Sequence, residues 1–397
     1  MPRTLIVTND FPPRRGGIET FVHEMARRFP PDEVLVYTSD GGPCGRASVE
    51  EFDAAQPYPV VRDRARWLLP TPRTAATARA LVARYGCDRV WFGAAAPLGL
   101  LAGPIGLPSV ATTHGHEMWW AAVPGTRQLL RRVGDECDTV TCLTAHTRRR
   151  VARALRPGPG ARLERLAPGV DPDLFTPGDT TGEGAEVRRR FGLGERPVIL
   201  CVSRLVARKG QDTLIRALPR VRSAVPGTTL LLVGEGPYGR RLRRLARETP
   251  GVPPGAVVFA GGRPHDELPP YYAAADVFAM PCRDRRLGLE AEGLGIVYLE
   301  AAAAGLPVLA GRSGGAPATV REGETGHVAD GRDVRAVADR LVELLTAPGA
   351  MRAMGEKSRA WAVREWSWDA TARRLRDLLS RTGSRTDSLT GSLTVKA

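Results

Sequence analysis

Short apolar runs alternate with amphipathic stretches along most of the chain. The run at 5–8 is rich in Leu, Ile and Val, as is typical of a strand buried on both faces. The next stretch, 19–29, has apolar residues at helical spacing. Strands that alternate with helices predict parallel sheets covered by helices. The predicted strands are 5–8, 34–38, 89–92, 109–113, 139–143, 198–203, 229–233, 257–260, 277–280, 308–310 and 327–329, and the predicted helices are 19–29, 75–85, 145–155, 185–191, 212–223, 239–248, 296–304, 334–345, 350–365 and 369–379.

The alternating pattern breaks once, between residues 163 and 197, where Pro and Gly are frequent. A chain of 397 residues is too long for one compact core, so this break predicts a connection between two domains. We expect each to be a doubly wound, Rossmann-like α/β domain. The predicted division is an N-terminal domain over 1–176, a linker over 177–196, a C-terminal domain over 197–365, a further helix within 366–381 and a disordered tail over 382–397.

The formal net charge of +14 comes almost entirely from Arg, because Lys occurs only at Lys209, Lys357 and Lys396. Such a balance favours anionic partners, whether phosphates, nucleic acid or acidic lipid, although arginines also decorate solvated helix faces. A nucleic-acid-binding protein is disfavoured, since the basic residues are dispersed and no aromatic-rich RNA-binding motif occurs.

We expect a cytoplasmic protein without a membrane span. The first residues run directly into a strand pattern, and the uncharged stretch 91–113 contains three prolines and four glycines that would break a transmembrane helix. The six cysteines form no C-x-x-C pair, and several lie in apolar runs. This usage predicts buried thiols in a reducing compartment.

Two loops at predicted strand ends carry candidate phosphate contacts. Gly16 and Gly17 lie between the first strand and its helix, where unpaired amides and a partial positive charge suit a phosphate; a Gly pair at such a turn is also often only a turn. Arg204 and Lys209 follow the strand 198–203, at the edge where open α/β sheets bind ligands. They could neutralise a departing diphosphate, or simply be solvated cations.

Two glutamates bracket a Gly-rich helix start in the C-terminal half. Gly293 and Gly295 open the predicted helix 296–304, so the amides of Gly295, Ile296 and Val297 would point at an anion. Glu300 lies inside that helix and could accept both hydroxyls of a ribose. Glu292 precedes the helix, near the expected position of a sugar. The alternative is a purely structural role, with one carboxylate capping the helix and the other exposed on the surface.

Two of the six histidines, His114 and His116, follow the strand 109–113 directly. An imidazole there could hydrogen-bond a sugar hydroxyl or an acceptor. The sequence His114-Gly-His116-Glu117 could also supply two ligands to a metal. A metal site usually needs a third ligand, which the sequence does not identify, so we predict no metal.

Several further motifs join these pieces into one ordered set. The motifs are Gly16-Gly17, Ala167-Pro168-Gly169-Val170-Asp171 with Phe175 and Pro177, Ser203-Arg204-Leu205 with Lys209-Gly210, Val233-Gly234-Glu235-Gly236-Pro237, Glu292 with Glu300, and Gly323-Glu324-Thr325-Gly326. From Thr4 to about Leu379, the chain resembles the retaining glycosyltransferases of family four, which have the GT-B fold. The resemblance implies two Rossmann-like domains with the active site in an interdomain cleft, and a C-terminal helix that crosses back to the first domain.

A narrower resemblance rests on residues near the N-terminus. They are Thr8-Asn9-Asp10-Phe11-Pro12-Pro13, Gly16-Gly17-Ile18 and Thr113-His114-Gly115-His116-Glu117. These resemble the actinobacterial GDP-mannose-dependent phosphatidylinositol mannoside mannosyltransferases, which implies an acidic lipid acceptor at the inner membrane face. The chain departs from its relatives at Ala318, where they often have Glu, and at Trp119-Trp120. Both departures bear on acceptor or loop details.

The resemblance also implies roles. Arg204 and Lys209 would hold the donor diphosphate, Glu300 the ribose, and Glu292 the hydroxyls of the donor sugar. The set of nucleotide contacts would further include Gly16, Gly17, Gly261, Arg263, Gly295, Ile296 and Val297. Either His114 or His116 would contact the transferred sugar, with His114 favoured by its position after the strand. Retaining transfer would then need no metal, because cations and helix amides stabilise the leaving nucleotide.

The sequence leaves alternatives open for the acceptor and for binding to a membrane. Arg62, Arg64, Arg66 and Arg73 flank Trp67-Leu68-Leu69, a composition that suits anionic lipid. A second basic run comprises Arg148, Arg149, Arg150, Arg153 and Arg156, and a solvated helix face explains it as well. The alternatives to a lipid-modifying mannosyltransferase are a UDP-sugar-dependent transferase with a soluble or other lipid acceptor, and a degenerate non-enzymatic homologue, against which the intact set of cations and glutamates argues.

Overall fold

The computed structural model describes residues 2–14, 16–40, 45–115, 117–155, 162–179, 182–288 and 290–382. Contacts divide the chain into two compact units. Unit 1 comprises Met1–Pro168 with Trp368–Ala397, and unit 2 comprises Gly169–Ser367. The division differs from the predicted one near residue 176, because residues from Gly169 onward pack with the second unit. The predicted tail, apart from Thr382, lies outside the described residues.

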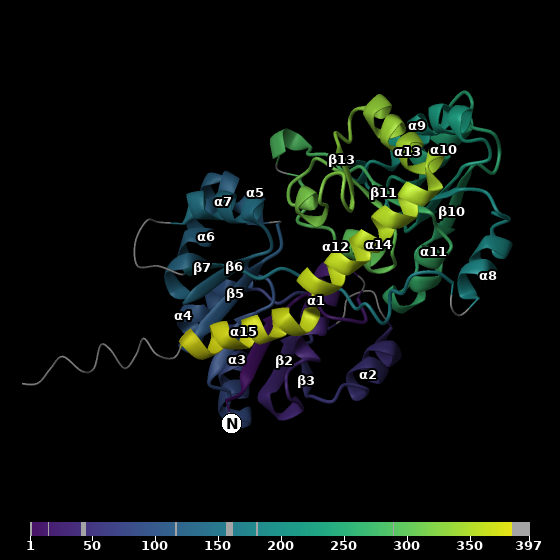
Figure 1. Cartoon of the computed structure of the whole chain (residues 1–397). Coiled ribbons are helices and arrows are strands. Elements are labelled where there is room, and N and C mark those ends of the chain that lie inside the picture. Colours follow the sequence, from purple (N-terminus) through teal and green to yellow (C-terminus); the bar gives the residue numbers. More distant parts are fainter. Residues whose placement is uncertain are drawn as a thin grey trace, which may run out of the picture. The chain divides into compact units, whose positions relative to one another are not determined.

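Unit 1 is built on a parallel sheet with helices around it (Figure 1). Its described strands follow the order β3-β2-β1-β4-β5-β6-β7, so the chain reverses direction across the sheet between β1 and β4. The strands are β1 (Thr4–Thr8), β2 (Val34–Thr38), β3 (Val60–Arg62), β4 (Arg89–Phe92), β5 (Ser109–Thr113), β6 (Thr139–Cys142) and β7 (Arg162–Arg165), and the helices are α1 (Gly17–Ala26), α2 (Arg46–Ala54), α3 (Pro72–Tyr85), α4 (Ala102–Ile105), α5 (Glu117–Ala122), α6 (Pro124–Glu136), α7 (Ala145–Ala154) and α15 (Trp368–Thr382).

Unit 2 repeats this plan with a second parallel sheet, whose described strands have the order β10-β9-β8-β11-β12-β13. The reversal falls between β8 and β11. The strands are β8 (Val198–Val202), β9 (Thr229–Val233), β10 (Val257–Gly261), β11 (Val277–Met280), β12 (Val308–Gly311) and β13 (Gly326–Ala329), and the helices are α8 (Glu183–Arg190), α9 (Gln211–Ala224), α10 (Gly239–Glu248), α11 (Pro269–Ala273), α12 (Ile296–Ala303), α13 (Val334–Thr346) and α14 (Pro348–Glu365).

Burial explains why the apolar runs predict the central strands so well. Every residue of β1, β2 and β8 is buried, as expected for strands covered on both faces. The elements that the sequence analysis missed are more polar or short. The edge strand β7 has the sequence RLER and no buried residue, and α6 begins with Pro-Gly and buries few residues. The helix α8, inside the predicted linker, packs on α11 of unit 2.

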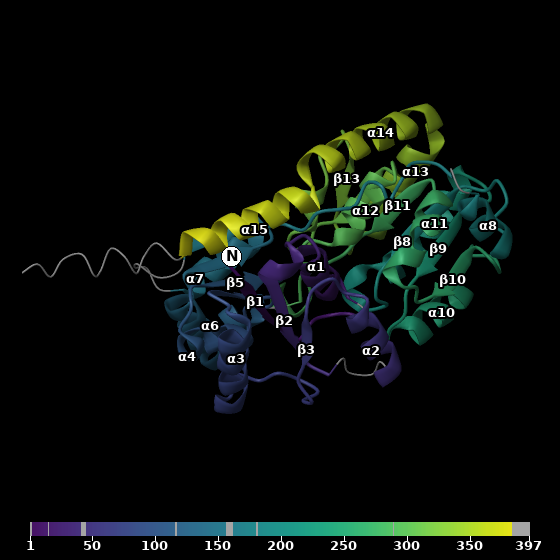
Figure 2. The same ribbon diagram turned by 90° about the horizontal axis from the view of Figure 1, so that it is seen from below.

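The C-terminal helix α15 is part of unit 1, where it packs on α1, β4 and β5 (Figures 1 and 2). Trp368 is 3% exposed, and its ring meets Phe21 edge-on at 5.7 Å. At the helix start, Arg28 Nε donates to an Asp369 carboxylate oxygen at 2.7 Å. This packing returns the chain end to the first sheet although some 200 residues of unit 2 intervene in the sequence.

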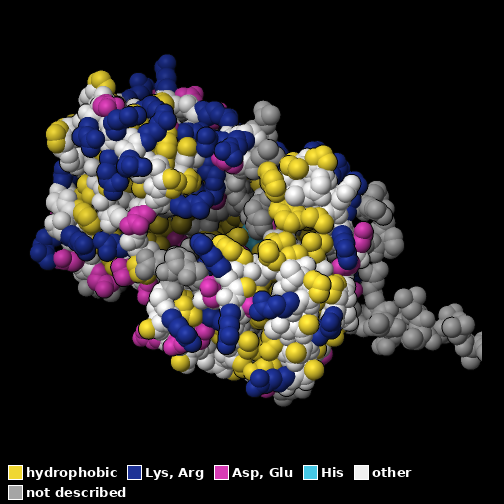
Figure 3. Space-filling view, turned by 180° about the vertical axis from the view of Figure 1, so that it is seen from behind, with side chains coloured by type: hydrophobic (Ala, Val, Ile, Leu, Met, Phe, Trp, Pro, Cys, Tyr) yellow, Lys and Arg dark blue, Asp and Glu magenta, His cyan; other side chains and the backbone are white. Residues whose placement is uncertain are grey.

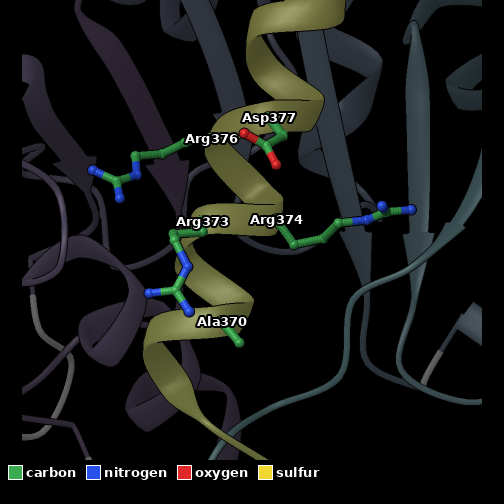
Figure 4. A pocket seen from close by; sticks show the side chains of 5 residues that line it. All are labelled: Ala370, Arg373, Arg374, Arg376 and Asp377. Atoms are coloured by element: carbon green, nitrogen blue, oxygen red, sulfur yellow. The ribbon is translucent and has the colours of Figure 1, made fainter.

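A shallow surface pocket lies on the outer side of α15 (Figure 4). None of its lining residues is a predicted site residue. Arg374 reaches away from the helix and pairs with Glu164 of β7 at 2.6 Å, so part of the lining serves to dock the helix. The lining residues are Ala370, Arg373, Arg374, Arg376 and Asp377.

Part of the excess positive charge lies on the exposed surface of one helix. On unit 2, the helix α10 has the sequence GRRLRRLARE, and the arginines of this helix are exposed. Figure 3 shows Lys and Arg side chains crowded over this part of unit 2. No helix among the described residues has both the length and the apolar character that a membrane span requires.

The described cysteines are free and buried, as predicted, whereas Cys44 lies outside the described residues. Burial raises the pKa of Cys201 to about 12 and that of Cys87 to about 11. These thiols therefore stay protonated at neutral pH and act as small apolar core residues.

We predict that Trp368→Ala lowers the free energy of unfolding by about 3–5 kcal/mol, because it leaves a large cavity between α15 and α1. Urea unfolding followed by circular dichroism measures the change. Arg373→Ala, on the exposed face of the same helix, is the control and should change stability by less than about 0.5 kcal/mol. Equal stabilities of the two variants would contradict the packing described for α15.

Candidate functional site

The predicted site residues of unit 2 follow the carboxyl ends of the strands that flank the chain reversal. Arg204 and Lys209 follow β8, while Glu292 and Glu300 lie after β11. In open parallel sheets, the crevice for a ligand lies at this switch point, where the loops leave in opposite directions. Topology alone therefore brings the predicted cations and glutamates to one edge of one sheet.

Lys209 and Glu292 form the centre of this site. Lys209 Nζ lies 2.7 Å from Glu292 Oε2, and Arg208 Nη1 lies 2.6 Å from the same oxygen. The carboxylate is almost fully buried, and the lysine side chain is 11% exposed. A carboxylate in this position needs a cation to compensate its charge, and here it has two.

The electrostatics keep Glu292 ionised. Burial on its own would raise the pKa of this carboxyl, but the charges of Lys209 and Arg208 and their hydrogen bonds outweigh burial and lower the pKa below its usual value. Because the folded-state pKa is lowered, the stabilisation is present at neutral pH and is lost only as the pH falls through that lowered value. The site is therefore charged under physiological conditions.

The backbone around Glu292 is held tightly. Its amide donates to Ser313 Oγ at 3.0 Å, and Ser313 Oγ donates to Asp284 at 2.6 Å. Gly314 has a φ of +52°, and a Cβ there would lie 1.9 Å from the Glu292 carbonyl oxygen. Only glycine fits that close approach, so the loop after β12 fixes the position of Glu292.

Glu300 has a tyrosine and a histidine as partners, where Glu292 has Lys209 and Arg208. It is 3% exposed, its Oε2 accepts a hydrogen bond from the Tyr272 hydroxyl at 2.7 Å, and its Oε1 lies 2.9 Å from His265 Nε2. Burial, followed by the charge of Glu300, raises the pKa of Tyr272 well above its usual value, so the phenol remains a donor. Glu300 can thus present a fixed carboxylate to a hydroxyl-bearing ligand.

The helix α12 begins beside these glutamates. Gly295 precedes it with a φ of +88°, and the Tyr298 amide donates to the Gly295 carbonyl at 3.1 Å. The amides of Gly295, Ile296 and Val297 have no carbonyl of the same helix to bind, so they supply the positive end of the helix dipole. These three predicted anion contacts lie between Glu292 and Glu300 in the sequence. In the structure they lie at the same edge of the sheet as the two glutamates.

The remaining predicted contacts of unit 2 lie on neighbouring loops. Arg204 has an exposed side chain just after β8. Gly261 ends β10 with a φ of +79°, and its carbonyl accepts from the Gly234 amide at 2.8 Å. Arg263 folds back on its own loop, donating to the Ala260 carbonyl at 3.2 Å and lying 5.9 Å from the Tyr271 ring centroid.

Unit 1 brings its predicted residues to the corresponding edge of its own sheet. His114 follows β5, its Nε2 lies 2.6 Å from the Gly93 carbonyl oxygen, and its ring meets Phe21 edge-on at 5.1 Å. Donation from Nε2 to that carbonyl would leave Nδ1 as the acceptor of the ring. His116 lies outside the described residues.

Gly16 and Gly17 lie at the start of α1, as predicted from the pattern of strand, loop and helix. A Cβ at Gly17 would meet nothing within 4 Å, whereas one at Gly16 would lie 2.2 Å from the Glu19 carboxylate. Neither residue has a φ that requires glycine, so Gly17 provides open space at the helix start and Gly16 allows the close approach of Glu19. Glu19 in the first turn already contributes negative charge there.

Sequence reasoning missed three contributors in unit 2, namely Arg208, His265 and Tyr272. Arg208 adjoins Lys209, and its charge was the available signal. His265 and Tyr272 gave none, because they meet Glu300 from 35 and 28 residues away. The described residues contain no group of three or more His, Cys, Asp or Glu side chains placed to hold a metal ion, and His116 lies outside them.

These features define a doubly wound α/β protein with paired cations and carboxylates at the ends of its parallel strands. Residues 15–174 match the family described as Glycosyltransferase Family 4, and residues 196–347 match Glycosyl transferases group 1. The chain belongs to glycosyltransferase family 4, and it is a glycosyltransferase with the two Rossmann-like domains of the GT-B fold.

The chain is 50% identical to the GDP-mannose-dependent alpha-(1-6)-phosphatidylinositol monomannoside mannosyltransferase of Mycolicibacterium smegmatis, over 95% of this chain and 98% of that protein. It is 43% identical to the GDP-mannose-dependent monoacylated alpha-(1-6)-phosphatidylinositol monomannoside mannosyltransferase of Corynebacterium glutamicum, over 95% of this chain and 97% of that protein.

Among solved structures, Anabaena HepE in complex with UDP is similar with a TM-score of 0.78 at 19% identity, covering 96% of this chain and all of that chain. The sucrose-phosphate synthase of Thermosynechococcus elongatus gives a TM-score of 0.79 at 22% identity, covering 96% of this chain and 99% of that one. Both similarities support the fold.

We predict that Lys209→Ala reduces sugar transfer at least about 100-fold, the loss of about 2.7 kcal/mol of transition-state stabilisation, while the protein stays folded. Arg208 still compensates Glu292 in this variant. The variant Arg208→Ala/Lys209→Ala leaves the buried carboxylate without a cation and should lose about 3–5 kcal/mol of stability. Initial rates measure the loss of transfer, and urea unfolding measures stability. If Lys209→Ala were as unstable as the double variant, the sharing of Glu292 between Lys209 and Arg208 would be contradicted.

Proposed function

We propose that the chain transfers mannose from GDP-mannose to a phosphatidylinositol mannoside acceptor, with retention of the anomeric configuration. The proposal is supported by the identity of 43–50% with relatives of that description along nearly the whole chain. The observation in the molecule that carries it is the buried Lys209–Glu292 pair at the switch point of unit 2, beside the amide end of α12. This arrangement suits a sugar diphosphate, which has both a strong negative charge and hydroxyl groups.

The contacts suggest how the donor would bind. Lys209 and Arg204 would neutralise the diphosphate, and the amides of Gly295, Ile296 and Val297 would donate to its oxygens. Glu300 would accept the ribose hydroxyls. Lys209 would turn from Glu292 to the diphosphate, while Arg208 stays paired with Glu292. Glu292 would then face the hydroxyls of mannose. On unit 1, His114 would contact the transferred sugar, and His116 stays a candidate for the same role.

Retention follows if attack and departure take place on the same face of the sugar. The acceptor hydroxyl oxygen forms a bond to the anomeric carbon as the bond from that carbon to the β-phosphate oxygen breaks. The hydroxyl proton passes to the departing phosphate, and GDP leaves. The growing charge on the phosphate is met by Lys209, Arg204 and the α12 amides, so the proposed reaction requires no metal.

The acceptor is a lipid in this proposal, so the protein would work at the cytoplasmic face of an anionic membrane. On unit 1, Trp67 is 48% exposed and Leu69 is 57% exposed, and Arg64 and Arg66 beside them are exposed as well. Such a segment suits the interface between water and anionic lipid. Leu68 and Arg62, grouped with it in the sequence analysis, do not contribute, because Leu68 is in the core and Arg62 is paired with Asp53 at 2.7 Å.

We predict turnover with GDP-mannose in a panel of GDP-, UDP- and ADP-sugars, because the relatives described as GDP-mannose-dependent share about half of this sequence. Product nucleotide released in the presence of a phosphatidylinositol mannoside extract, measured for each donor, tests this. Preference for a UDP-sugar would overturn the donor assignment and favour the alternative transferase. The Lys209→Ala variant is the background control.

We further predict that Trp67→Ala/Leu69→Ala loses most binding to vesicles that contain phosphatidylinositol, since it removes the exposed apolar pair and leaves the arginines. Co-sedimentation at low and high salt, with phosphatidylcholine vesicles alongside, measures it. Leu129→Ala, which removes an exposed leucine elsewhere in unit 1, is the matched control. Equal binding of wild type and double variant, or equal binding to both vesicle types, would contradict this docking segment.

A further inference from the structure

A histidine that the proposed reaction does not use lies directly against one of its carboxylates. His265 begins a short 3-10 turn, His265–Glu267, after β10. Its Nε2 lies 2.9 Å from Glu300 Oε1, across 35 residues of sequence. The histidine side chain is 37% exposed, whereas that of Glu300 is 3% exposed. His265 is therefore the partner that approaches Glu300 from the solvent side.

The ring of His265 is itself held in place. Phe175, which is 1% exposed, meets His265 edge-on with ring centroids 5.5 Å apart, and meets Tyr272 edge-on at 5.3 Å. Tyr272 is also buried and donates to the other oxygen of Glu300. One phenylalanine thus contacts both groups that hydrogen-bond the carboxylate, and within the described part of the chain each carboxylate oxygen has one such partner.

A carboxylate held in this way has a defined plane. Each oxygen of an ionised carboxylate can accept about two hydrogen bonds, so His265 and Tyr272 leave capacity on both oxygens for a pair of neighbouring hydroxyls. A carboxylate with one partner alone could rotate about its last torsion, which is broad for glutamate. Fixing that torsion before the ligand arrives removes an entropic cost of binding.

We propose that His265 is a positioning residue, which orients the Glu300 carboxylate to accept both hydroxyls of the donor's ribose. The inference rests on the proposed function, because it takes a nucleoside diphosphate as the ligand. His265 acts through Glu300 and does not touch the reacting atoms. Its removal should therefore weaken donor binding and leave the chemical step nearly unchanged.

The experiment compares two nucleotides that differ only in the 2′-hydroxyl. Calorimetric titration of GDP and 2′-deoxy-GDP into wild type and His265→Ala should show GDP binding weakened about tenfold in the variant, about 1.4 kcal/mol, with 2′-deoxy-GDP weakened less than about twofold. His265→Gln, whose amide can donate, should recover part of the loss. In steady-state kinetics, the donor KM should rise while kcat stays within about threefold.

Asp266→Ala, at the exposed neighbouring position, is the matched control and should bind both nucleotides as wild type does. Equal weakening of both nucleotides in His265→Ala would mean a purely structural role, and tighter GDP binding would mean that His265 competes with the ribose; either result overturns the inference. If the wild-type protein binds UDP and not GDP, the proposed donor is wrong but the role of His265 is still tested. The same comparison is then made with UDP and 2′-deoxy-UDP.

Discussion

One buried carboxylate holds the candidate site of unit 2 together. Glu292 accepts both Lys209 and Arg208 on the same oxygen, and so joins the loop after β8 to the loop after β11. A single cation would be fully engaged by such a buried charge. With two, Lys209 can turn to an anionic ligand while Arg208 remains, so the carboxylate is never left without compensation. The second cation thus keeps the buried carboxylate compensated while a positive charge is available to a ligand.

The two glutamates of unit 2 have different surroundings, and the difference matches the two chemical parts of a sugar nucleotide. Glu292 lies among cations beside the amide end of α12, which suits a diphosphate and the sugar joined to it. Glu300, inside α12, accepts hydrogen bonds from a phenol and an imidazole, which fix its carboxylate for hydroxyl groups. The helix α12 fixes the separation of the two.

The sequence predicted the central strands well because they are buried on both faces and read as uninterrupted apolar runs, as in β2 and β9. It missed the edge strand β7, which has no buried residue, and α6, which begins with Pro-Gly and packs on the helices α5 and α7. No local apolar pattern predicts either element. The same limit applies to the site. Lys209 and Glu292 belong to local motifs, and the order of the strands brings them together. His265 and Tyr272 reach Glu300 only through the tertiary fold, so neither spacing nor composition pointed to them.

The most direct test is an experimental structure of the protein with GDP bound. We predict a phosphate oxygen about 2.7–2.9 Å from Lys209 Nζ, Arg208 still paired with Glu292, and the ribose hydroxyls hydrogen-bonded to Glu300. Nucleotide bound away from the switch point of unit 2, or bound there while Lys209 keeps its contact with Glu292 and makes none to phosphate, would contradict it.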